Sequence, residues 1–165
     1  MRFEQRLAHT ATAEAMCAEL SKCFNVEASE VALLKAEHNS LTFLFPPELR
    51  AAGSIPLSST SAVAARTANT RKVELFNNFG TVQHANVFET IKLATAEHAG
   101  PPGSNTIQKL MSTPIIDSDR NVLGVIQVCH KGLTPEQSGP DFTLADLQNL
   151  ELAAKVVSRL AFMKP

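Results

Sequence analysis

The stretch KLMSTPIIDSDRNVLGVIQVCHKG, residues 109–132, contains two apolar runs on either side of a polar segment. The polar segment, residues 117–121, is typical of a tight turn, in which Asn121 tolerates a left-handed backbone. We therefore predict a β-hairpin. Side chains alternate between the faces of a strand, and both sets in the second run are largely apolar, so we expect both of its faces to be buried. One face would carry Val122, Gly124, Ile126, Val128 and His130, and the other Leu123, Val125, Gln127 and Cys129.

The residues upstream of this hairpin predict a mixture of helices and strands. Residues 3–24 space apolar side chains three and four apart without an internal Gly or Pro, which predicts one amphipathic helix. Two β-leaning runs around residues 37–40 predict a first hairpin, which Pro46 and Pro47 end. The next elements are a short strand at 55–57, an alanine-rich helix that the serines and threonine of SSTS could cap, a strand at 73–76 and a helix from about His84 to His98.

The last segment carries a helix start signal. Thr143 is a candidate N-cap, Asp146 can return a bond to it, and Phe142 can pack on Leu147 as a hydrophobic staple. We predict a helix from residue 144 to about residue 163. Its two apolar stripes are Leu147, Ala154, Val157 and Ala161, and Leu152, Val156, Leu160 and Met163. One stripe exceeds what the chain's own core needs, so we expect this surplus face and the N-terminal helix to contact a second copy of the chain.

The order of these elements defines an α+β domain with one antiparallel sheet. In this order the chain resembles a GAF domain, on the strength of the IPL at 55–57, the alanine-rich helix, TPIIDSDRNVLGVIQVCHKG, and FTLAD before the final helix. The resemblance covers about residues 5–162 of a single domain, 1–165. It implies a profilin-like antiparallel sheet of about six strands, with the N- and C-terminal helices packed on one face and a ligand cavity on the other.

GAF domains of cyclic-nucleotide phosphodiesterases carry an Asn-Lys pair at the end of this strand, followed by Phe, three residues, Asp and Glu. Lys131, Phe142 and Asp146 match that motif, whereas His130 replaces the Asn and Leu147 replaces the Glu. The capping box and staple explain Phe142 and Asp146 without a ligand, and a pair between Lys131 and Asp146 would tie the strand to the helix. The incomplete motif therefore supports the fold more than nucleotide binding.

The same resemblance implies which side chains line the ligand cavity. They are Phe45, Ser61, Ala62, Asn77, Asn78, Phe79, His84, Phe88, Thr106 and Gln108. This set offers aromatic faces, amides, hydroxyls and a helix N-terminus, with no Arg or Lys cluster for a phosphate. The alternative is that these side chains only fill the core.

Composition excludes several classes of protein. The formal net charge is −1 and no segment is rich in Lys or Arg, so we expect neither nucleic acid nor an anionic membrane as a partner. The charged N-terminal stretch lacks the apolar core of a signal peptide, and no apolar run reaches the ~20 residues of a membrane span. Cys17, Cys23 and Cys129 lack CxxC spacing. We therefore expect a cytoplasmic protein with reduced thiols.

Enzyme and chromophore chemistry find little support. Free methionine-R-sulfoxide reductase, an enzyme of the GAF family, has cysteines in segments that correspond here to STSAVAARTANT and NNFGTVQHANVFET, which contain none. Bilin-binding GAF domains end this strand in Cys-His, as Cys129 and His130 do, but residues 81–109 lack the attachment cysteine. His84 or His98 could hold haem as a single axial ligand, but the histidines show no metal-ligand spacing. We expect no catalytic residue and no metal site, and leave the cofactor and the roles of Cys129 and His130 open.

The function that we predict is a noncatalytic sensor domain, which binds a small molecule and signals through dimer contacts of its terminal helices. A structural dimerisation module without a ligand is the first alternative. An enzyme acting on a small metabolite is the second, for which the chain shows no catalytic triad, Gly-rich phosphate loop or metal motif.

Overall fold

An antiparallel sheet of six strands, in the order β3-β2-β1-β6-β5-β4, forms the centre of the fold. The computed structural model describes residues 2–60, 62–79 and 107–164, so the helix expected at about 84–98 lies outside the described residues. The strands are β1 (Val31–Glu37), β2 (Ser40–Phe45), β3 (Ser54–Pro56), β4 (Glu74–Phe76), β5 (Ile107–Ile116) and β6 (Val122–Lys131). The predicted α+β class with a six-stranded antiparallel sheet is confirmed.

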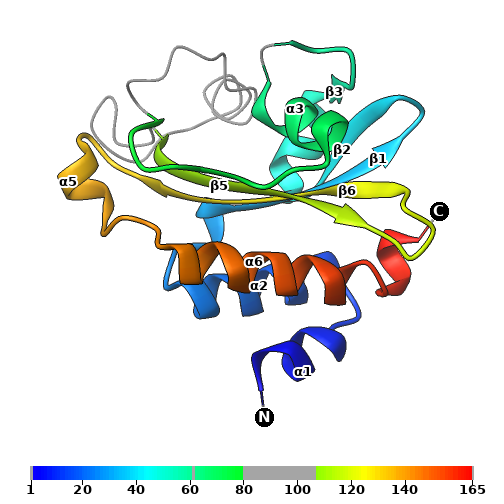
Figure 1. The fold of residues 1–165 in the computed structure, drawn as a ribbon, viewed down its shortest axis with the longest axis horizontal. Helices are drawn as coiled ribbons and strands as arrows, with labels where there is room; N and C mark the ends of the chain where they lie inside the picture. The colour runs from blue at the N-terminus through cyan, green and yellow to red at the C-terminus, as the bar shows by residue number, and fades with distance from the viewer. Residues whose placement is uncertain (1, 61, 80–106, 165) are drawn as a thin grey trace.

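Helices cover both faces of this sheet (Figure 1). α2 (Ala13–Phe24) and α6 (Leu144–Val157) lie on one face, α1 (Phe3–Ala8) packs against both from outside, and α3 (Val63–Thr70) lies on the other face. The terminal helices therefore occupy one face, as predicted. The short elements are η1 (Ala28–Glu30), η2 (Pro47–Ala52), α5 (Pro135–Ser138) and η4 (Ala161–Met163).

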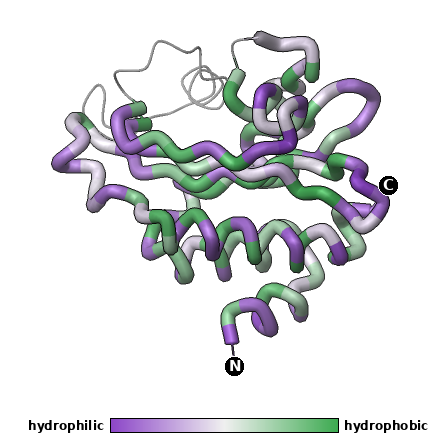
Figure 2. The backbone as a smooth tube through the Cα atoms, viewed as in Figure 1, coloured by the Kyte–Doolittle hydropathy of each residue, from purple (hydrophilic) through white to green (hydrophobic). Residues whose placement is uncertain are grey.

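Two hydrophobic clusters fill the space on either side of the sheet. The helix-side core, which includes Met16, Leu20, Ile126 and Leu150, lies under α2 and α6. The α3-side core includes Phe43, Ile55, Ala65, Leu110 and Cys129. Figure 2 shows β5 and β6 as mostly apolar strands between the two layers. The prediction that both faces of β6 are buried is confirmed.

The alternation along β6 fails at its first two residues. Ile115 pairs with Gly124 but Ile116 pairs with Val122, so the register shifts at this point. Because an extra residue in a bulge reverses the alternation, Leu123 lies in the helix-side core and Val122 packs against the α3-side core. Both were predicted on the opposite faces.

The two predicted hairpins form, with one difference in their turns. His38 and Asn39 join β1 to β2 with positive φ angles of 51° and 63°, as a two-residue turn requires. Between β5 and β6 the left-handed residue is Arg120, with φ 71°, and not Asn121. The Asp117 carboxylate accepts bonds from the backbone N–H groups of Asp119 and Asn121, which fixes the turn so that Arg120 takes this position.

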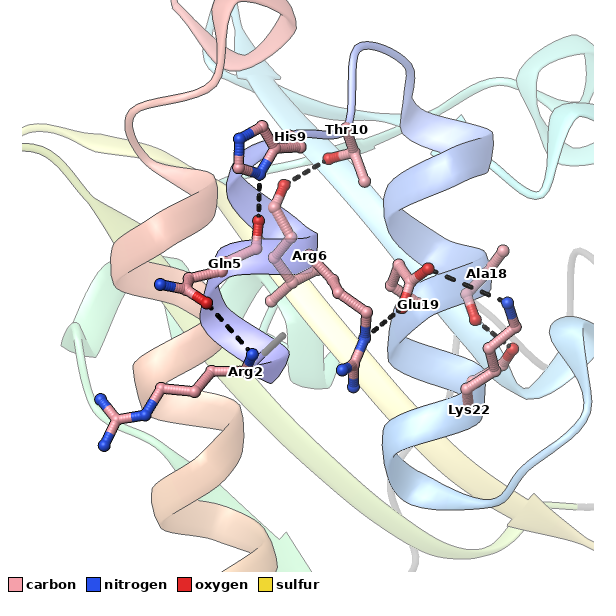
Figure 3. A network of polar contacts seen from close by, with 10 residues as sticks. Arg2, Gln5, Arg6, His9, Thr10, Ala18, Glu19 and Lys22 are labelled. Carbon is pink, nitrogen blue, oxygen red and sulfur yellow. Dashed lines mark hydrogen bonds and ion pairs between the residues drawn. The ribbon is translucent and has the colours of Figure 1, made fainter.

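The single N-terminal helix predicted over residues 3–24 is wrong, because α1 and α2 are separated by residues 9–12. The Thr12 hydroxyl accepts from Ala15 N–H as the N-cap of α2, and the Thr10 hydroxyl donates to the Leu7 carbonyl at the end of α1. Figure 3 shows how the Arg6 guanidinium, 3.1 Å from the Glu19 carboxylate, joins the two helices. Two threonines thus break the helix without a Gly or Pro.

α3 forms where predicted, but its start differs. Its N-cap is Ala62, which has no side chain to cap the helix, and the Ser59 hydroxyl accepts from the Ala62 N–H instead. A two-pronged ion pair between Arg66 and Glu74 then fastens α3 to β4. This pair adds to the pairing of β4 with β5, which places β4 at the edge of the sheet.

The Thr143 cap of α6 is confirmed, with reciprocal bonds between Thr143 and Asp146. The predicted end near residue 163 is wrong, since α6 ends at Val157 and the chain then turns into η4. This turn buries Leu160 and Met163 in the helix-side core, and α1 packs against α6. Most of the expected surplus stripe is therefore covered by the chain itself, whereas Leu152 remains 42% exposed.

Candidate functional site

The candidate ligand site lies where β5 begins and β6 ends. Phe76 at the end of β4 pairs with Leu110, so the residues after β4 continue toward the start of β5. On the α3 side, Ala62, Phe79 and Ile107 are buried in one core at this end. Ala62 and Phe79 are two of the residues predicted from the sequence to line the ligand cavity. Ser61, His84, Phe88 and Thr106 lie outside the described residues.

Phe45, also predicted to line the cavity, packs against the helix-side core. A bulge between Leu33 and Leu34 pairs Leu33 with Phe45 and Leu34 with Phe43, which turns Phe45 away from the face that alternation assigns to it. The aromatic ring on the α3 side is that of Phe43, which is fully buried. The alternating apolar residues of SLTFLF were the signal for Phe43, and the prediction missed it.

Asn77 and Gln108, two further predicted residues, bond to the segment after β6. The Asn77 amide donates to the Phe142 carbonyl over 2.9 Å and accepts from the Phe142 N–H over 2.8 Å. The buried Gln108 amide donates to the Gly132 carbonyl over 3.0 Å. Asn78, between Asn77 and Phe79, is exposed. Both amides therefore hold backbone in place, a role that the resemblance did not imply.

Two further side chains hold the same segment. Lys109, only 4% exposed, donates to the Gly139 carbonyl and forms a 3.0 Å ion pair with Asp141. The His130 ring stacks on the Phe142 ring, with centroids 4.4 Å apart. Asn77, Gln108, Lys109 and His130 thus form an anchor for the loop between β6 and α6, which we call the loop anchor. Lys109 was not predicted, because nothing local marks a lysine for burial.

Lys131, a residue of the phosphodiesterase-type motif, follows His130 of the loop anchor and bonds to η1. Its ammonium donates to the Ser29 carbonyl over 2.8 Å, and its backbone N–H donates to the Glu30 carboxylate over 2.7 Å. These contacts tie β6 to η1. The Asp146 carboxylate caps α6, and the expected pair of Lys131 with Asp146 is not among the contacts between described residues. The described roles of Lys131, Phe142 and Asp146 are therefore structural.

A buried polar group lies between α3 and the sheet. The hydroxyls of Thr67 and Ser112 are 2.8 Å apart, and the Gln127 amide donates to Ser112 over 3.3 Å. All three residues are buried. Because buried polar groups need partners, this group fixes the position of α3 on the sheet.

None of the three cysteines, Cys17, Cys23 and Cys129, forms a disulfide in the described part of the chain. Burial, with a smaller contribution from Glu14, raises the pKa of Cys17 far above its ordinary value, and burial also raises the pKa of Cys23. Cys129 is fully buried. Because the thiolate is the reactive form, Cys17 and Cys23 are poor nucleophiles at neutral pH. Among residues 2–60, 62–79 and 107–164, no three His, Cys, Asp or Glu side chains gather to hold a metal ion.

We expect the stability of the fold to depend on pH through His130. Burial and the nearby Lys109 lower its pKa below the ordinary 6.5, against the opposing effects of Glu30 and Asp146. The unfolded chain therefore binds this proton more readily, so stability should fall as the pH drops from about 7 toward the folded-state pKa. We expect the His130→Gln variant to lose part of the fall in melting temperature between pH 7.5 and pH 5.5, measured by circular dichroism. His38→Asn, in the exposed β1–β2 turn, should keep the wild-type pH dependence, and equal slopes for all three proteins would contradict the prediction.

Comparisons with known proteins agree with this geometry. A model of the GAF domain family matches residues 9–160, so the chain belongs to the GAF domain family. No curated protein matches the sequence. None of the helices in the part of the chain that the structure describes is long and apolar enough to cross a membrane.

Solved structures share the fold at low sequence identity. The GAF domain of an Acinetobacter phosphoenolpyruvate-protein phosphotransferase is 14% identical with a TM-score of 0.66, over 95% of this chain and 86% of that one. A free methionine-R-sulfoxide reductase from Neisseria meningitidis, in complex with its substrate, is 14% identical with a TM-score of 0.61, over 95% and 82%. The reduced form of the Staphylococcus aureus enzyme fRMsr is 15% identical with a TM-score of 0.57, over 95% and 91%. At these identities the likenesses show the fold alone, and the fold includes enzymes such as these reductases.

Proposed function

We propose that this GAF domain is a noncatalytic sensor, which binds a small molecule on the α3 side of the sheet and transmits its occupancy to α6. The observation that carries the proposal is the pair of bonds between Asn77 and Phe142. Asn77 stands two residues before Phe79, which is buried in the α3-side core, and Phe142 directly precedes the Thr143 N-cap of α6. One side chain thus joins the candidate site to the start of α6.

This connection provides a physical route for the signal. A ligand that displaces Phe79 would move Asn77 and strain its two bonds to the backbone of Phe142. The ligand can shift the equilibrium only by the difference in its affinity for the two arrangements. The signal is then a change in the position or stability of the first turn of α6, which follows Phe142.

The cysteines favour a sensor over a thiol enzyme. Free methionine-R-sulfoxide reductases share the fold, but all three cysteines of this chain lie in its described part, and no disulfide joins them. Cys17 and Cys23 lie on α2, on the side of the sheet away from α3, and their raised pKa values keep them protonated.

We further propose that two copies meet through α1, α2 and α6. Leu152 is the exposed apolar residue in the middle of α6, with Val156 half-buried one turn later. A contact there would let a movement of α6 reach the second copy. Native mass spectrometry reports copy number and ligand mass together, so it is the first test. Purified protein is then screened by thermal shift against cyclic nucleotides, purines, amino acids, haem and tetrapyrroles.

A dimer that retains or gains a small molecule, with a melting temperature that rises with ligand concentration, is the expected result. A dimer that stays empty and unshifted would favour the ligand-free dimerisation module. A monomer at micromolar concentration would overturn the dimer contact. Turnover of a bound metabolite would overturn the noncatalytic proposal.

The Asn77→Ala variant tests the route itself. This variant removes the amide that bonds to the backbone N–H and carbonyl of Phe142. Because both backbone groups lose their partner, we expect a loss of about 1–3 kcal/mol in the free energy of unfolding. Hydrogen exchange in the first turn of α6 should become faster and should no longer respond to a ligand found in the screen. Asn77→Asp, which keeps the acceptor but loses the donor, should lie between wild type and Asn77→Ala.

The Asn121→Ala variant, in the exposed turn between β5 and β6, is the matched control and should behave as wild type in both measurements. Protection of α6 that still responds to ligand in Asn77→Ala would show that the signal takes another route.

A further inference from the structure

A second open site lies at the opposite end of β5 from the loop anchor. It is a groove of about 690 Å³ between the chain after α3, the last residues of β5 with the turn that follows, and α6. Figure 1 shows α5, next to the loop anchor, and the β5–β6 turn at opposite ends of the sheet. The volume falls within the range of small-molecule sites, roughly 300–1,000 Å³. Neither the family's cavity nor the proposed sensor site includes it.

Four cations from three separate segments line this groove: Arg71, Lys72, Arg120 and Lys155. All four are exposed, and none forms an ion pair with any residue in the described part of the chain. In contrast, Arg6 and Arg66 elsewhere in the structure do have carboxylate partners. Unpaired cations that converge on one hollow favour an anionic ligand.

Two carboxylates also line the groove, and they do not cancel its charge. The Asp117 carboxylate already accepts two backbone bonds within its own turn. Glu151 is exposed, one helical turn before Lys155. Four cations against two carboxylates make the groove positive in a chain whose formal net charge is −1.

The backbone adds an observation about the two arginines. Arg71 and Arg120 have positive φ angles of 59° and 71°, a conformation in which Gly and Asn are more favourable than Arg. A positive charge also suits Arg71 at the C-terminal end of α3. Arg120 lies in a hairpin turn and has no helix end to complement. The presence of an arginine at this left-handed turn position therefore has another cause, and binding of an anion in the groove would be such a cause.

The edge of β5 argues against an extended peptide as the occupant. Glu74, the first residue of β4, pairs with Ser112, so the residues of β5 after Ser112 have no partner strand on the β4 side among the described residues. The groove borders this part of β5. Pro114 lies in this part of β5 and has no N–H to offer to an added strand. Together with Val73 and Ile116, it instead forms an apolar surface beside the cations.

We propose that this groove binds a small organic molecule with two or more phosphate groups. The phosphates contact Arg71, Lys72, Arg120 and Lys155, and the organic part lies on Val73, Pro114 and Ile116. Arginine suits this role because its planar guanidinium can donate two parallel bonds to one phosphate.

The test uses isothermal titration calorimetry of the full chain in magnesium-free buffer, with ADP, pyrophosphate and inorganic phosphate as probes. We expect ADP to bind more tightly than pyrophosphate, and both to bind roughly tenfold or more tightly than phosphate, with an affinity that falls as salt rises. Arg71→Gln and Arg120→Gln should each weaken ADP binding roughly tenfold, and Glu151→Gln should strengthen it a few-fold. Lys22→Gln, on α2, is the matched control and should leave binding unchanged.

Arg120→Asn separates binding from folding. Asn tolerates the left-handed turn, so this variant should melt at or above the wild-type temperature while it loses ADP binding to the same extent as Arg120→Gln. Equal affinity of wild type and Arg120→Asn for ADP, or no ADP binding at millimolar concentration, would overturn the proposal. So would tight binding of a poly-glutamate peptide with no binding of ADP, since that result would make the groove a protein contact.

Discussion

Replacing Gly124 with alanine should lower the free energy of unfolding by more than about 3 kcal/mol, or prevent folding altogether, because the space for a side chain is already occupied. A Cβ at this position would lie 2.0 Å from the Leu34 carbonyl oxygen and 2.9 Å from the Met163 side chain. The nearer atom belongs to the backbone of β1, the neighbouring central strand, where Lys35 pairs with Gly124. The side chain of Met163 can shift, but the backbone of β1 cannot without breaking the pairing of β1 with β6.

Urea denaturation followed by circular dichroism is the suitable measurement, because the chain has neither Trp nor Tyr to report by fluorescence. Gly53→Ala is an instructive comparison, since its Cβ would meet no atom within 4 Å but its φ of +115° strains any other residue. The Gly53→Ala change should cost about 1–3 kcal/mol, because the backbone at Gly53, with φ 115° and ψ −164°, lies in a region that glycine almost alone adopts. A Gly124→Ala protein within 1 kcal/mol of wild type would mean that β1 and β6 are further apart than described.

Phe43→Ala should cost about 3–5 kcal/mol, the usual range for truncating a fully buried phenylalanine. Its ring is buried in the α3-side core together with Leu41 and Ile55, so its truncation removes apolar contacts and leaves a cavity. Phe45→Ala should cost clearly less, since Phe45 is only half-buried and lies at the margin of the helix-side core. The same urea titrations measure both.

These two phenylalanines also separate the two faces of the sheet functionally. If the ligand binds on the α3 side, a conservative Phe43→Leu change should alter ligand affinity, whereas Phe45→Leu should not. Phe43→Leu is expected to fold, with a cost of less than about 1.5 kcal/mol. Equal losses of stability for Phe43→Ala and Phe45→Ala would contradict the bulge that directs Phe45 away from α3.

Several parts of the fold followed from the amino-acid sequence because their causes are local. Both hairpins are encoded by apolar runs on either side of a polar turn, and the start of α6 by Thr143 and Asp146, whose mutual bonds span three residues. The burial of both faces of β6 was readable from its composition. The family could also be identified, because the order of elements depends on such local signals.

Other features depended on contacts between segments far apart in the chain. The bulges in β2 and β6 arise where neighbouring strands adjust to each other, and they reversed the faces predicted for Phe45 and for Leu123. The end of α6 at Val157 is likewise set by the core that Leu160 and Met163 enter. Side-chain alternation is read from the residues of one strand alone, so it does not predict a bulge that depends on the pairing with the neighbouring strand.

The candidate site divides in the same way. The sequence by itself identified the family, and from that resemblance we predicted that Asn77, Phe79 and Gln108 line a ligand cavity. Only the tertiary structure decided what those side chains do: Asn77 holds Phe142, 65 residues away, and Gln108 holds Gly132. The four cations of the second groove are scattered over residues 71–155, and no spacing in the sequence predicts their convergence. A hydrogen bond or a charged groove depends on distances in space, and those are set only when the sheet and its helices have packed.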